Sequence, residues 1–126
     1  MSQKNGAEHF QLLALAAAAA VTVTGNVAGV DITSYVGKAM LVLTSSAGAG
    51  TAPTLNVKVQ ESDTLGGAYT DIAGAAFAQV TAAAVAQKLV IDVDVAKPFI
   101  RVVDTLGGTG PSFTRGVSLL ALRQER

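Results

Sequence analysis

The chain has 126 residues; half are hydrophobic, only 14% are charged, and nine basic side chains balance nine acidic ones. This length predicts one domain, and the balanced charge without basic runs argues against nucleic acid as a main partner, because phosphate binding needs clustered Lys and Arg. The absence of cysteine excludes disulfides and thiolate metal sites.

An apolar run, Phe10–Val21, follows a polar head at residues 1–9. The run is shorter than the roughly 20 residues of a membrane span, and the head lacks the basic character of a signal peptide. We therefore expect a partly mobile N-terminal arm over residues 1–17 and a folded domain over residues 18–126. A cleaved secretion signal over residues 10–20 is the alternative. The arm is expected to dock on the domain or on a neighbouring molecule through four candidate interface residues: Phe10, Leu12, Leu13 and Leu15.

Apolar and polar residues alternate with period two along much of the remaining chain, which predicts β-strands. In residues 88–94 the pattern places Leu89, Ile91 and Val93 on one face of a strand. A continuous apolar run at residues 38–44 predicts a strand covered on both faces. Eight strands are expected at residues 21–24, 38–44, 55–61, 68–72, 76–80, 88–94, 99–103 and 113–122, and residues 27–32 are a candidate for a ninth.

These short strands are separated by turn signals, and no long amphipathic helix interrupts them. The phrase Asp-Thr-Leu-Gly-Gly occurs twice, at residues 63–67 and 104–108. We expect each copy to form a turn after a strand, because Asp caps turns and Gly adopts positive φ without steric cost. The sequence therefore predicts an all-β, single-domain antiparallel β-sandwich of the jelly-roll type, with an N-terminal arm.

Chemistry-bearing residues are sparse. His9 is the only histidine and lies in the polar head, so no Ser-His-Asp triad or His-based metal site is expected. Asp92 and Asp94 share one face of a strand, but a hard cation needs more oxygen ligands than these two provide. The stretch 107–110 is glycine-rich but lacks the Lys-Ser/Thr of a phosphate-binding loop. We expect no catalytic, cofactor-binding or metal-binding residues and no enzymatic activity.

Two further expectations concern charged and aromatic side chains. Arg101 and Arg115 are expected to form weak surface pairs with Asp92, Asp94 or Asp104 across strands. The aromatic residues expected to anchor the core are Tyr69, Phe77, Phe99 and Phe113.

Three segments carry a family resemblance: Pro53–Asp63 with the glycines after it, Tyr69–Ile72 and Phe99–Val103. In these segments the chain resembles the capsid decoration proteins, also called cement or head auxiliary proteins, of tailed bacteriophages. The resemblance implies a non-enzymatic virion protein that binds the major capsid protein on the capsid exterior and stabilises the expanded shell. It carries over no catalytic residues.

The same resemblance implies an oligomer, with a homotrimer favoured and a homodimer as the alternative, because decoration units have closed symmetry. The protein would be in the host cytoplasm during assembly and on the virion afterwards, without a nucleic-acid or membrane partner. Two other functions remain as alternatives. One is a secreted or surface-displayed β-sandwich adhesion module, and the other is a phage tail or head-fibre component.

Overall fold

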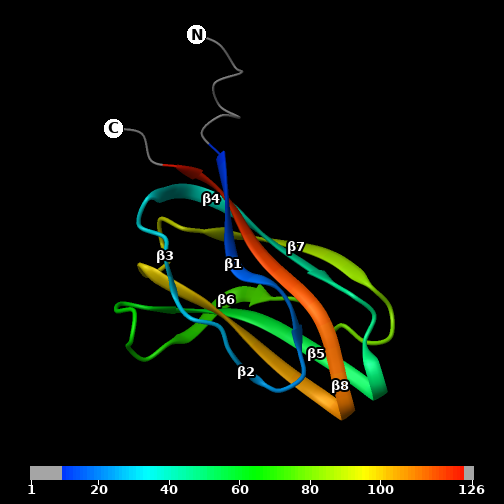
Figure 1. The fold of residues 1–126 in the computed structure, drawn as a ribbon. Coiled ribbons are helices and arrows are strands. Elements are labelled where there is room, and N and C mark those ends of the chain that lie inside the picture. The colour runs from blue at the N-terminus through cyan, green and yellow to red at the C-terminus, as the bar shows by residue number, and fades with distance from the viewer. Residues whose placement is uncertain (1–9, 124–126) are drawn as a thin grey trace.

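The computed structural model describes residues 10–123, and this part of the chain forms eight β-strands and no helix, hence none that could span a membrane. All strand pairs are antiparallel. Figure 1 shows the strands in two facing layers. The strands are β1 (Phe10–Val21), β2 (Gly25–Asn26), β3 (Val30–Asp31), β4 (Tyr35–Ser45), β5 (Ala49–Ser62), β6 (Thr70–Ala76), β7 (Val85–Asp92) and β8 (Phe99–Arg123).

Strand β8 joins the two layers. Its N-terminal arm, residues 99–109, pairs with β5 on one side and with β2 and β3 on the other. Its C-terminal arm, residues 113–123, pairs with β1 and β4. We call the layer β1-β8-β4-β7 sheet A, and the layer of β2 and β3, β8, β5 and β6 sheet B. The long strand turns the corner between the sheets at the orange bend in Figure 1.

The order of strands confirms the predicted jelly roll. With β2 and β3 taken as one strand and the arms of β8 as two, the chain has eight segments. Sheet A then has the order 1-8-3-6 and sheet B the order 2-7-4-5. This is the jelly-roll arrangement, in which long strand pairs fold over into two four-stranded sheets.

Glycines allow the chain to turn the corner. Gly50 and Gly108 have φ angles of 107° and 100°, values that side-chain-bearing residues rarely adopt. The two strands also approach closely there, since a Cβ on Gly108 would lie 2.5 Å from the carbonyl oxygen of Ala52. Glycine is therefore required at these two positions, where β5 and β8 stay paired around the bend.

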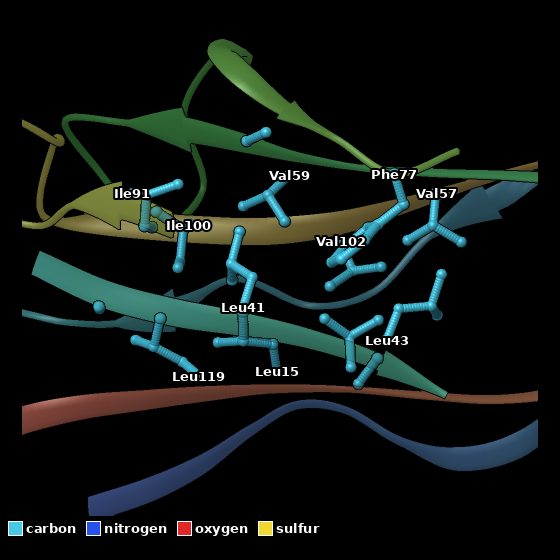
Figure 2. Packing of buried hydrophobic residues seen from close by; sticks show 14 of the residues in the cluster. Leu15, Leu41, Leu43, Val57, Val59, Phe77, Ile91, Ile100, Val102 and Leu119 are labelled. Atoms are coloured by element: carbon cyan, nitrogen blue, oxygen red, sulfur yellow. The ribbon is translucent and has the colours of Figure 1, made fainter. Parts of the chain in front are cut away.

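The core lies between the sheets and consists of aliphatic side chains with two phenylalanines. Figure 2 shows side chains from sheet A meeting those of sheet B across this layer. Period-two alternation places every second residue in the core, as in β8, where Val117, Leu119 and Ala121 are fully buried. The prediction for residues 88–94 holds in the same way, with Ile91 and Val93 buried and Leu89 half-buried.

The N-terminal segment differs from the expected arm. The proposed boundary between residues 17 and 18 lies inside β1, which pairs with β8 from Phe10 to Val21. Leu15 and Ala16 are 2% and 3% exposed, so this segment contributes to the core. Residues 1–9 lie outside the described residues. Because Ala-rich segments favour helices over strands in isolation, only pairing with β8 makes residues 14–20 a strand.

The position of β1 in the sheet also bears on the alternative that residues 10–20 are a cleaved secretion signal. The cleavage expected for a signal over residues 10–20 falls within β1. Cutting there would remove Leu15 and Ala16 from the core described here.

The two copies of Asp-Thr-Leu-Gly-Gly have different structures. The first, residues 63–67, forms the predicted turn between β5 and β6, and Gly67 donates a hydrogen bond to the carbonyl oxygen of Thr64. The second, residues 104–108, is not a turn: residues 104–107 lie within β8, paired with β5, and Gly108 with its φ of 100° begins the bend of the same strand. Predicting a turn there was wrong because a partner strand distant in sequence keeps the backbone of residues 104–107 extended; for example, Asn56 pairs with Thr105.

Candidate functional site

The outer face of sheet A carries apolar side chains on all four strands, with Lys38, Lys88 and Asp92 beside them on β4 and β7. The inward residues of β4 and β8 are fully buried, so their neighbours in sequence point away from the core. The register places Leu12, Leu120, Met40 and Val90 in one row across β1, β8, β4 and β7. We call this surface the apolar face, and its members are Phe10, Leu12, Met40, Val42, Val90, Leu120 and Leu122.

Several of these side chains are strongly exposed. Leu12 is 70% exposed, Val90 is 61% exposed and Phe10 is 47% exposed, whereas the other members are half-buried. A shallow depression on the face is lined by five apolar residues and one lysine: Phe10, Ala39, Met40, Val90, Leu120 and Lys38. No described element packs over it, although the sequence predicted cover on both faces of residues 38–44. A contiguous apolar patch of this kind is typical of a surface that binds another molecule.

The outer face of sheet B is polar by contrast. Gln60 donates a hydrogen bond of 2.8 Å to Asp71, and Lys58 lies 3.0 Å from the same carboxylate. Arg101 donates to the side-chain oxygen of Gln60 at 2.8 and 3.0 Å, and its guanidinium lies 4.3 Å from the ring centre of Tyr69. These contacts join β5, β6 and β8. The polar side chains named here therefore find their hydrogen-bond and ion-pair partners on the same face. The polar face therefore suits solvent, and the two outer faces differ in character.

Hydrogen bonds from Gln60 and Lys58 lower the pKa of Asp71 below its usual 3.8. A carboxyl group with a lower pKa in the folded state adds stability above its unfolded pKa, and this contribution is lost as pH falls through the folded pKa. We expect Asp71→Asn to lower the melting temperature near pH 6, with the difference from wild type shrinking as the pH falls below the usual carboxyl pKa of 3.8. Thermal unfolding at a series of pH values checks this, and a difference independent of pH would contradict it.

A buried ion pair lies between the sheets. Arg115, on the C-terminal arm of β8, donates to both carboxylate oxygens of Asp104, on the N-terminal arm, at 2.9 and 2.6 Å. Both side chains are 5% exposed. Arg115 also donates to the carbonyl oxygen of Ala17, 3.2 Å away, where β1 departs from regular pairing. The sequence named this pair among its options but placed it on the surface, whereas the structure places it in the core.

The candidate interface residues divide between two environments. Phe10 and Leu12 belong to the apolar face, whereas Leu15 is in the core and Leu13 packs against it. Alternation along β1, paired with β8, causes this division, because residues 10 and 12 face outward and residues 13 and 15 face the core. The sequence missed Met40, Val42 and Val90 as interface candidates, although the apolar residues at both parities in residues 38–44 were the signal for a second apolar face.

The other candidates from the sequence do not come together in one site among the described residues. Asp92 accepts a hydrogen bond from the backbone of Asp94, so it caps the turn after β7. Among residues 10–123, no cluster of His, Cys, Asp and Glu side chains is positioned to hold a metal ion. His9 lies outside the described residues, and residues 107–110 form the corner of β8.

Only some of the aromatic residues predicted as core anchors lie in the core. Phe77 and Phe113 are core residues as predicted, at 5% and 0% exposure. Phe99 is half-buried. Tyr69 is not a core anchor, because it lies beneath Arg101 and donates to the carbonyl oxygen of Leu65 at 2.7 Å.

No family model and no curated protein sequence matches the chain. Solved structures do resemble it. The SPBc2 prophage-derived protein YomS has a TM-score of 0.52 at 12% identity, with 87% of this chain and 92% of YomS covered. The VP2 subviral particle of infectious bursal disease virus has a TM-score of 0.57 at 13% identity, covering 90% of this chain and 32% of VP2. At such low identity these similarities show the fold, which is an all-β antiparallel sandwich shared with a prophage protein and a viral particle protein.

Proposed function

We propose that this protein is a non-enzymatic virion protein that binds the outside of a tailed-phage capsid through its apolar face and stabilises the expanded shell. The observation that carries the proposal is the contrast between the apolar outer face of sheet A and the hydrogen-bonded polar face of sheet B. A protein of this shape can lie with one sheet on a large surface and the other in solvent. The resemblance to phage decoration proteins and the fold shared with prophage and viral particle proteins support the same class.

Mass action is the proposed mechanism of stabilisation. A protein that binds the assembled shell and not its dissociated subunits stabilises the shell by an amount that grows with its free concentration relative to Kd. Burying one exposed Leu or Val side chain contributes about 1.5–3 kcal/mol. A few such side chains, repeated in many copies over a shell, are enough to oppose its disassembly.

Co-sedimentation with capsids that lack the protein tests this proposal. We expect saturable binding to expanded shells and none to compact precursor shells. Val90→Lys should weaken binding about tenfold or more, because it removes apolar contact from the proposed interface. The matched control is Val23→Lys, since Val23 is 74% exposed and lies outside the apolar face. If the wild-type protein binds neither shell, the capsid proposal fails, and the tail, fibre and adhesion alternatives become the ones to test.

A further inference from the structure

Strand β1 forms one edge of sheet A and pairs with β8 alone among the described strands. It has 12 residues, Phe10–Val21, without a charged residue or a proline. Natural proteins usually protect long edge strands with charges, prolines or bulges, because unpaired backbone N–H and C=O groups can recruit another strand. The bulges of β1 lie after Ala14, so residues 10–14 form a regular, unprotected edge.

No described strand covers this edge, so a strand from a second molecule can pair with it. The segments of the chain outside the described range, residues 1–9 and 124–126, are mostly polar in sequence and do not match the apolar side chains of β1. The other described strands of sheet A already have their places in the order β1-β8-β4-β7. A second copy of β1 has the same uncharged apolar character, so two copies meet without opposing charges.

We infer that two copies of this protein pair through residues 10–14 of β1, antiparallel about a twofold axis near Leu12. Such an isologous contact uses the same segment of both subunits. It would place Leu12 of one copy beside Leu12 of the other and join the two copies of sheet A into one continuous sheet. The two apolar faces would then form one larger apolar surface. The inference concerns the self-contact and is independent of whether the apolar face binds a capsid.

Because the chain has no cysteine, a single introduced thiol reports this contact cleanly. Directly opposed residues in antiparallel strands have Cα atoms about 4.5–5.5 Å apart. That separation lies within the range of about 4.4–6.8 Å that a disulfide spans. We expect Leu12→Cys to form a disulfide-linked dimer under mild oxidation, seen by non-reducing electrophoresis. Val23→Cys is the control, since that residue is similarly exposed but lies outside residues 10–14.

Sedimentation equilibrium without capsids supplies the second measurement. We expect wild-type protein to sediment as a dimer, and Leu12→Lys to raise the dimer Kd about tenfold or more, because it sets two positive charges side by side. Leu12 is 70% exposed, so the monomer fold should survive, as circular dichroism can show. A monomer at all concentrations, a trimer, or a Leu12→Cys variant that cross-links no faster than Val23→Cys would overturn the inference. None of these results depends on shell binding.

Discussion

Replacing Arg115 by methionine should lower the free energy of unfolding by about 3–5 kcal/mol, because the change leaves the carboxylate of Asp104 buried without a partner. Both side chains are 5% exposed, so water cannot take the place of the guanidinium. The carbonyl oxygen of Ala17 would lose its side-chain donor as well. Urea unfolding followed by circular dichroism measures the change.

The double variant Asp104→Leu, Arg115→Met separates the cost of a broken pair from the value of an intact one. Replacing both members of a buried ion pair with apolar residues is often neutral or stabilising. We therefore expect the double variant to recover most of the stability that Arg115→Met loses. Lys58→Met, which breaks an exposed pair with Asp71, is the control and should cost much less, because solvent screens exposed ion pairs. Equal losses in the buried and exposed pairs would contradict the structure.

Gly108→Ala should destabilise the protein by about 3 kcal/mol or more, because two costs combine at this position. The φ angle of 100° is unfavourable for alanine, and the added Cβ would lie 2.5 Å from the carbonyl oxygen of Ala52. Relief requires β5 and β8 to separate at the corner of the sandwich. The midpoint of urea unfolding measures this effect.

Gly110→Ala is a matched control two residues away. Gly110 also has a positive φ, 59°, but nothing lies within 4 Å of the position a Cβ would take. Its substitution should cost about 1–2 kcal/mol from backbone strain alone. Equal effects of the two substitutions would show that the close approach of β5 and β8 does not limit the corner.

Local patterns in the sequence predicted much of the fold. Period-two alternation in residues 88–94 placed Leu89, Ile91 and Val93 on the face that packs toward the core, because the direction of a side chain along a strand depends only on the parity of its position. Turn signals between short alternating segments predicted the jelly roll. Residues 63–67 form the expected turn because no partner strand competes for that backbone.

The errors share a different cause. Residues 104–108 have the same five amino acids as the turn at residues 63–67, but pairing with β5 keeps residues 104–107 extended. Ala14–Ala20 has little strand preference by itself and becomes part of β1 through β8. In both segments a partner distant in sequence outweighs the local preference.

In the candidate site, too, some features follow from the local sequence and others only from long-range pairing. The sequence alone established that the protein is a neutral, cysteine-free, β-rich chain with apolar residues at both parities of residues 38–44. Only the tertiary structure determined which apolar residues enter the core, so that Leu15 is buried while Leu12, three residues earlier, stays exposed. It also brought Asp104 and Arg115 together between the sheets. The physical reason is that alternation fixes the two faces of each strand, whereas long-range pairing decides which strands become neighbours and which face is covered.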